Sequence, residues 1–379
     1  MSNLSELLPT GGGQNAVDFV ASGTLSSGQT VALKSDGTVE AVTATTLSAV
    51  DNAGTPSTFV ATGECFYISS TYDAASQKIV VAFQDRTTPN YGTAVVGTVS
   101  GTSISFGTPV VFESASTLFT SCTYDSNNQK IVIAYRDGGN SDYGTAIVGT
   151  VSGTSISFGT PVVFNSGGQT TIYPRGAVYH SSAGKVVISY SDGGNSYSAT
   201  SIVGTVSGNS ISFGSSVAFD SSSTDIYSTF DSSNEKIVVT YRDNYNSNYG
   251  TAIVGTVSGT SISFGSSVVF ESANTLYPSV VYDSANQKIV IAYRDNGNSD
   301  YGTAIVGTVS GTSISFGTPV IFQSSFSYYM SATYDENAQK VAVFYNGSSV
   351  GTVIVGTVSG TSISFNSPTV FETGSVSYV

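Results

Sequence analysis

The sequence is poor in the residues on which most metal and enzyme chemistry depends. Its 379 residues include one histidine, two cysteines, two methionines and no tryptophan. These are too few for a zinc or iron centre, and two cysteines cannot build a disulfide framework. The single histidine, His180, stands where aspartate stands in comparable stretches, so a Ser-His-Asp site is not expected. We therefore expect no cofactor, no metal and no enzymatic activity.

Basic residues are also scarce, and long apolar runs are missing. Against 25 acidic side chains there are 12 basic ones, which gives a net charge of −13 and a pI near 4.2. Such a surface repels phosphate backbones and anionic lipids, so we expect no nucleic-acid partner and no membrane insertion. The opening MSNLSELLPT lacks the basic and apolar regions of a signal peptide. The protein should therefore be made in the cytoplasm.

What the chain has in abundance is repetition. The motif GTVSG occurs six times, at intervals of 52, 55, 51, 52 and 49 residues, beginning at Gly97, Gly149, Gly204, Gly255, Gly307 and Gly356. Periods of this length, made of short alternating apolar segments, are typical of radial β-propellers. The sequence therefore predicts an all-β fold, a six-bladed β-propeller over residues 54–379 with four-stranded blades of about 52 residues.

Each repeat reads as four strands. In the stretch 275–322 they are TLYPSVVYD, KIVIAYRD, YGTAIVGTV and SISFGTPVIF. Proline cannot donate to a sheet ladder and is confined to edges, and it recurs in the fourth segment at Pro109, Pro161, Pro319 and Pro368. We expect the fourth strand outermost and the first strand innermost. Two end segments, GTPSTFV at 54–60 and GSVSYV at the C-terminus, are both candidates to complete the ring.

The hairpin between the first two strands has an acid at its entrance and a lysine at its exit. Asp73 precedes Lys78 by five residues, and the spacing recurs in every repeat, with His180 replacing the aspartate in the third. The pattern predicts turn capping together with an exposed ion pair across the turn.

Residues 1–53 do not follow the repeat. Their glycine-rich turns separate brief alternating runs, which predicts a small β module or arm that attaches to another protein.

Aromatic residues at the start of each innermost strand, and Arg-Asp pairs in the loops after the second strand, form the candidate binding site. Ring faces stack on sugars, and planar polar groups bind hydroxyls. The alternative is that the rings fill the channel and the pairs tie blades together. The candidate residues are Tyr67, Phe119, Tyr173, Tyr227, Tyr277, Tyr329, Arg136, Asp137, Arg242, Asp243, Arg294 and Asp295. The acidic net charge favours neutral or weakly charged glycans.

Two of these loops also have a D-x-x-N-x-D spacing that offers oxygen ligands to calcium. They contain Asp137, Asn140 and Asp142 in one case, and Asp295, Asn298 and Asp300 in the other. Neither has the distal glutamate of an EF-hand, and the competing interpretation is a set of turn-forming Asx hydrogen bonds.

The segment LLPTGGGQNAVDFVASGTLSSGQTVALKSDGTVEAV resembles the N-terminal segment of virion structural proteins of tailed, especially marine, bacteriophages. The repeats, such as YGTAIVGTVSGTSISFGTPVVF, resemble propeller arrays of such proteins. The resemblance implies a tail fibre, appendage or surface decoration located in the virion. Residues 1–53 would bind other virion proteins, and the propeller would bind a host-surface glycan or receptor. A homo-oligomer is compatible with this role. The alternatives are a cellular glycan-binding lectin and a glycan-cleaving enzyme.

Overall fold

The computed structural model describes residues 31–33, 38–41, 54, 56–60, 63–173, 175–374 and 376. The chain divides into two compact bodies, Met1–Asp51 and Asn52–Val379. In the first body, β1 (Val31–Leu33) pairs antiparallel with β2 (Val39–Ala41). The attachment role of residues 1–53 stays a prediction.

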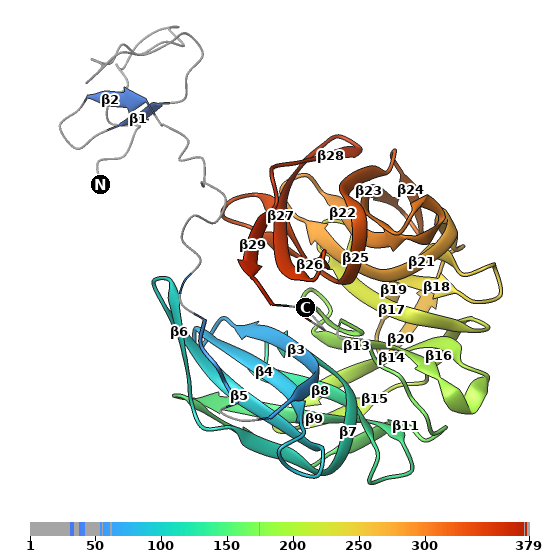
Figure 1. The fold of residues 1–379 in the computed structure, drawn as a ribbon. Helices are drawn as coiled ribbons and strands as arrows, with labels where there is room; N and C mark the ends of the chain where they lie inside the picture. Colours follow the sequence, from blue (N-terminus) through green and yellow to red (C-terminus); the bar gives the residue numbers. More distant parts are fainter. Residues whose placement is uncertain are drawn as a thin grey trace, which may run out of the picture. The chain divides into compact units, whose positions relative to one another are not determined.

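The second body is built from antiparallel strands, which confirms the all-β prediction (Figure 1). Its repeat unit has four strands. In the first unit, β3 (Cys65–Asp73) pairs with β4 (Lys78–Asp85), β4 pairs with β5 (Tyr91–Ser100), and β5 pairs with both β6 (Ser103–Phe106) and the start of β7 (Val110–Asp125). The outer strand is therefore broken in two, and Pro109 lies in the break, where no backbone donor is needed.

The same pairing order continues along the chain. The second and third units contain β8 (Lys130–Asp137), β9 (Tyr143–Ser152), β10 (Ser155–Phe158), β11 (Val162–Asn165), β12 (Ala177–His180), β13 (Lys185–Asp192), β14 (Ser198–Ser207), β15 (Ser210–Phe213) and β16 (Val217–Asp220). The fourth and fifth units contain β17 (Ser223–Asp231), β18 (Lys236–Asp243), β19 (Tyr249–Ser258), β20 (Ser261–Phe264), β21 (Val268–Asp283), β22 (Lys288–Asp295), β23 (Tyr301–Ser310) and β24 (Ser313–Phe316). The last unit contains β25 (Val320–Asp335), β26 (Lys340–Gly347), β27 (Val350–Ser359), β28 (Ser362–Phe365) and β29 (Thr369–Glu372).

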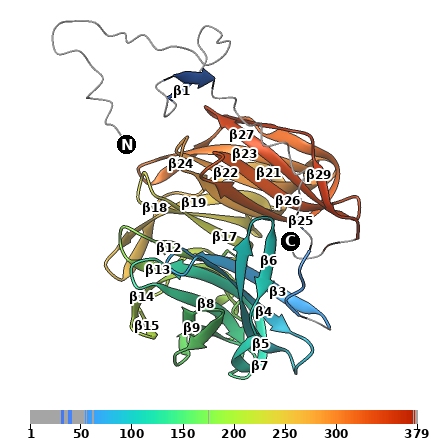
Figure 2. The same ribbon diagram turned by 90° about the vertical axis from the view of Figure 1, so that its left-hand side faces the viewer.

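Three long strands, β7, β21 and β25, link consecutive units. Each begins as the outer strand of one unit and ends as the inner strand of the next. In two views at right angles, the first and last units lie next to each other (Figure 1, Figure 2). Two short 3₁₀ helices, Gly193–Asn195 and Asn296–Asn298, lie in loops. No helix among the described residues is long and apolar enough to cross a membrane.

Neighbouring units pack through a recurring aromatic contact and a recurring glycine. Phe270, from an outer segment, packs edge-on against Tyr293 of the next unit, with ring centroids 5.3 Å apart. Beside it, Gly265 lies so close to the carbonyl oxygen of Thr312 that any side chain would overlap that oxygen. The apolar clusters accordingly lie between units, where each unit covers the face of the next.

The segment 54–60 takes the place of an outer strand in front of the first unit. Phe59 packs against Phe83, at 5.1 Å between ring centroids, and against Phe106, at 5.5 Å. Gly54 faces the carbonyl oxygen of Thr102, as Gly265 faces that of Thr312. Of the two candidate end segments, this one therefore covers the first unit.

The C-terminal segment does something different. The Asn346 side-chain amide donates to the carbonyl oxygen of Val376, at 2.6 Å. In the first unit the corresponding amide, of Gln84, donates to the carbonyl oxygen of Thr117 at the start of the next inner strand, at 2.7 Å. Val376 therefore lies where the inner strand of a following unit begins. Both end segments contribute, at different places.

The hairpins between the first and second strands confirm the predicted capping but not the ion pairs. The Asp73 carboxylate accepts from the backbone N–H groups of Ala75 and Ser76. His180 does the same with its Nδ1, which accepts from Ala183 N–H at 3.2 Å. Among the described residues, no hairpin lysine forms a salt bridge with its turn acid.

Three of the hairpin lysines donate hydrogen bonds to threonine hydroxyls instead of pairing with the turn acid. Lys130 donates to the Thr150 hydroxyl at 2.7 Å, and Lys185 and Lys340 make the same contact with threonines of their own third strands. The predicted ion pair is wrong at these positions because the threonine stands directly across the ladder from the lysine.

Candidate ligand-binding cavity

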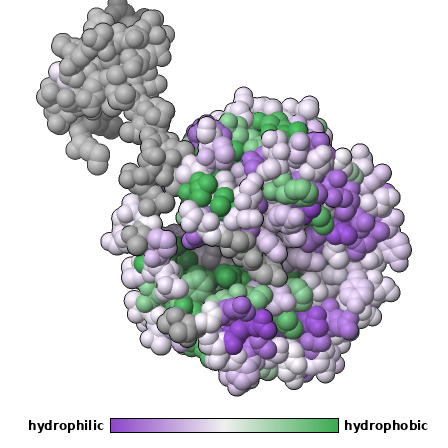
Figure 3. All heavy atoms as spheres, in the orientation of Figure 1, coloured by the Kyte–Doolittle hydropathy of each residue, from purple (hydrophilic) through white to green (hydrophobic). Residues whose placement is uncertain are grey.

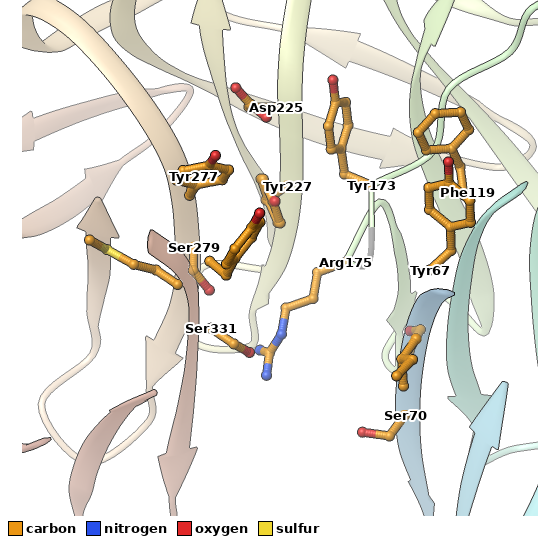
Figure 4. Close-up of a pocket in the computed structure, with 14 residues that line it drawn as sticks. Tyr67, Ser70, Phe119, Tyr173, Arg175, Asp225, Tyr227, Tyr277, Ser279 and Ser331 are labelled. Carbon is orange, nitrogen blue, oxygen red and sulfur yellow. The ribbon is translucent and has the colours of Figure 1, made fainter. Parts of the chain in front are cut away.

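A cavity of about 260 Å³ lies where the inner strands of all units meet (Figure 4). The space-filling view shows a hollow with apolar side chains around it (Figure 3). All the aromatic residues proposed from the sequence line the cavity: Tyr67, Phe119, Tyr173, Tyr227, Tyr277 and Tyr329. Their rings contact one another in pairs, and the Tyr67 and Phe119 centroids are 4.7 Å apart.

A backbone bulge places four of these rings. Tyr67, Phe119, Tyr277 and Tyr329 have φ between 51° and 53°, in the left-handed region that residues with side chains seldom adopt. At each of them the register of the inner strand shifts, for instance between Leu276 and Ser279. A bulge re-aims a side chain, which a regular strand at this position would not do.

The fourth unit uses the same bulge for a different residue. Its left-handed position is Asp225, with φ of 52°, and Tyr227 follows two residues later. Tyr227 pairs with Thr240, whereas Ser279 holds that place opposite Ala292 in the fifth unit. The fourth unit therefore presents both a carboxylate and a ring to the cavity.

The third unit has a longer inner segment. Thr171 pairs with Ser191, and the next pair along this segment joins Ala177 to Ile188. The inner segment therefore advances six residues between these two pairs. The equivalent advance in the second unit, from Leu118 to Cys122, is four. The two additional residues place Arg175 as well as Tyr173 in the cavity lining.

Two opposite charges thus line an aromatic cavity. Burial raises the pKa of Asp225 to about 6, and the Arg242 guanidinium, 3.9 Å from that carboxylate, opposes the increase. Burial lowers the pKa of Arg175, but an arginine side chain stays protonated in proteins. Burial also raises the pKa of Tyr227 well above its usual value, and the Asp225 carboxylate adds to that effect. At neutral pH the Tyr227 hydroxyl is therefore a neutral donor and acceptor.

The loop residues proposed from the sequence do not line the cavity. Arg136 pairs with Asp142 and Arg294 with Asp300, each at 2.8 Å within one loop. The Arg294 guanidinium also lies 4.4 Å from the ring centroid of Tyr328, in the inner strand of the next unit, so this arginine does contact two units. The other three acids are turn caps that accept backbone N–H groups of their own loops: Asp137, Asp243 and Asp295. Arg242 reaches the cavity indirectly, through Asp225. A binding role for these loop residues stays a prediction.

The carboxylate oxygens proposed as calcium ligands take part in these ion pairs and turn caps. Asp142 and Asp300 are paired with arginines, and Asp137 and Asp295 cap turns. Within the described ranges, no group of three or more His, Cys, Asp or Glu side chains is placed to hold a metal ion.

Sequence reasoning missed Arg175 and Asp225. The 55-residue interval between the second and third GTVSG motifs signals extra residues in the third repeat, but it does not say where they point. Asp225 was missed because the repeats were aligned on their aromatic residues, and the aromatic residue of this repeat, Tyr227, stands two positions later.

The sequence matches no family model and no curated protein. Among solved structures, the BP39L lectin from Burkholderia pseudomallei matches with a TM-score of 0.54 at 11% identity, over 80% of this chain and 83% of that one. A mutant of AofleA from Arthrobotrys oligospora matches with a TM-score of 0.52 at 9% identity, over 81% and 86%. A mutant of the NanB sialidase from Streptococcus pneumoniae matches with 0.51 at 11%, over 75% and 65%. The described body therefore has the curled antiparallel sheets of propeller-like lectins and sialidases.

Proposed function

We propose that residues 54–379 form a six-bladed β-propeller that binds a glycan in its central cavity and catalyses no reaction. The ring of aromatic side chains carries the proposal, because sugar rings stack on aromatic faces and this cavity gathers several of them. Tyrosine hydroxyls, Ser279 and Asp225 supply the polar groups that fix sugar hydroxyls. The fold of the solved lectins is compatible with this use.

The charges that line the cavity favour binding over cleavage. Glycosidases of the common type use two carboxyl groups about 5–9.5 Å apart. Among the residues that line this cavity, Asp225 is the one carboxylate. A glycosidase of that two-carboxylate type is therefore the less favoured alternative.

We further propose that the protein is a phage virion component, attached to other virion proteins through residues 1–53 and presenting the propeller to the host surface. This part rests on the resemblance of the N-terminal segment and of the repeats to phage proteins. The competing proposal is a cellular lectin with the same cavity.

Replacing Tyr277 with alanine should weaken glycan binding roughly tenfold, because one stacking face is worth about 0.5–1.5 kcal/mol. Binding is measured by glycan array and then by calorimetry on the best monosaccharide. Tyr277→Phe should keep most of the affinity. Tyr245→Ala, at a ring that is 74% exposed in a loop, is the matched control and should change nothing. Unchanged binding by a folded Tyr277→Ala variant would remove the cavity as the glycan site.

Deleting residues 1–50 should leave a folded propeller that no longer enters particles. The contacts of Phe59 with Phe83 and Phe106 lie outside the deletion, so the first unit stays covered. Circular dichroism measures folding, and immunoblots of purified particles measure incorporation. Normal incorporation of the truncated chain would refute the attachment role, whereas loss of folding would show that residues 1–50 stabilise the second body.

A further inference from the structure

Arg175 is held in place by its backbone. The Ser228 N–H donates to the carbonyl oxygen of Arg175 at 2.9 Å, so the third unit is tied to the fourth at this residue. On either side, Gly176 N–H donates to Tyr173 and Ser189 N–H donates to Gly176, both at 2.8 Å. These three backbone hydrogen bonds fix the segment from which Arg175 enters the cavity.

Within the part of the chain that the structure describes, the guanidinium of Arg175 has no counter-charge. Among the described residues, no hydrogen bond, ion pair or ring contact involves it. Asp225, the carboxylate of the cavity, is instead 3.9 Å from Arg242. Figure 4 shows the guanidinium directed away from Asp225, toward the end of the cavity where Ser331 lies. A partly desolvated cation without a partner is costly, and an anion that entered the cavity would remove that cost.

The anion must be small and singly charged. Arg175 is the one cationic side chain in the lining, so a phosphate ester, with a charge between about −1.5 and −2, would be only partly neutralised and would also face Asp225. A carboxylate matches the planar guanidinium with two parallel hydrogen bonds. The cavity of about 260 Å³ is slightly below the usual range of roughly 300–1,000 Å³ for drug-sized ligands, which suits one sugar ring.

We propose that the cavity binds the carboxylate of an acidic sugar, a hexuronic acid whose ring stacks on the tyrosines while Arg175 holds its carboxylate. This inference rests on the proposed glycan-binding function and names its ligand class. It replaces the expectation of neutral glycans, which was drawn from the net charge of −13. Charges on the outer surface are screened over about 8 Å at physiological ionic strength, whereas Arg175 would contact the ligand directly.

The test compares isosteric ligands. The full chain is titrated by calorimetry with the sodium salts of D-glucuronic, D-galacturonic and D-mannuronic acid, with the corresponding neutral hexoses, and with D-glucuronamide, which replaces the carboxylate by an amide of similar shape. At least one uronate should bind tenfold or more tightly than its hexose, and glucuronate should bind more tightly than glucuronamide if it is the preferred ring. Arg175→Gln should abolish the preference, and Arg175→Lys should keep part of it.

The control variant is Arg86→Gln, at an arginine whose side chain is 48% exposed and pairs with Glu64. It should leave the uronate preference intact. If hexoses and uronates bind equally and Arg175→Gln changes neither affinity, the inference is overturned while glycan binding stands. If no sugar binds either in this panel or on a glycan array, the proposed function fails and the inference fails with it. Thermal melting of each variant shows that lost binding is not lost folding.

Discussion

Replacing Gly265 with alanine should destabilise the second body by about 3 kcal/mol, the upper end of the usual cost of overpacking. The added methyl group would overlap the carbonyl oxygen of Thr312 in the next unit. It cannot easily move away, because Gly265 N–H is bonded to the carbonyl oxygen of Val254 at 3.0 Å. Thermal unfolding followed by circular dichroism should show a midpoint lower by roughly 5 °C.

The chain supplies its own control for this substitution. Asn366 stands at the equivalent place of the last unit, with the same backbone bond to Val355 at 3.0 Å, but it is exposed. Asn366→Ala should change stability by no more than about 0.5 kcal/mol. Equal losses in the two variants would mean that the loss at Gly265 does not come from the approach of the next unit.

Replacing Asp225 with asparagine should stabilise the protein above pH 7, by up to about 3 kcal/mol. Burial raises the pKa of this carboxyl from 3.8 to about 6, and its side chain is 15% exposed. The folded state therefore favours the neutral form. This preference adds its full contribution to the free energy of unfolding below about pH 4, and that contribution is lost as the pH rises through 6. Asparagine is neutral throughout, so the gain over wild type should appear between those values.

The measurement is the difference in free energy of unfolding between the two proteins in urea at pH 4, 6 and 8. Taking the difference removes the general effect of the large acidic charge. Glu336→Gln, at an exposed carboxylate, is the matched control and should give a flat difference. A flat difference for Asp225→Asn would mean that Arg242 compensates fully for the burial of the charge.

The repeat was readable from the sequence because its strands, turns and glycines are local features. The Ser-Gly-Thr turn after GTV needs positive φ at its glycine, and Gly259 has φ of 60°. The prolines of the fourth segment marked the broken outer edge correctly, because proline cannot donate to a ladder. Pro278 is different: it lies in an inner strand, at the register shift between Leu276 and Ser279. Four aromatic residues of the cavity were found for a similar reason, since they recur at one place in the repeat, whereas Tyr227 stands two positions later.

What the sequence did not disclose depends on contacts between units. The left-handed bulge at Tyr277 is invisible in the residue pattern, because tyrosine has no preference for that conformation. The direction of Arg175 depends on how the fourth unit bonds its backbone. The partner of Arg294 is set by the path of its loop, which brings Asp300 to 2.8 Å from the guanidinium.

The different treatment of the two ends has an evolutionary consequence. Phe59 covers the first unit, and Asn346 of the last unit is bonded to Val376, so neither contact requires a strand shared between the first and last sheets. A whole repeat gained or lost between them would leave both end contacts in place, but it would change the number of inner strands around the cavity. Recombination between the nearly identical GTVSG segments would make that change in frame. Such a change would preserve the two ends and alter the cavity, because the inner segment of every unit contributes to its lining.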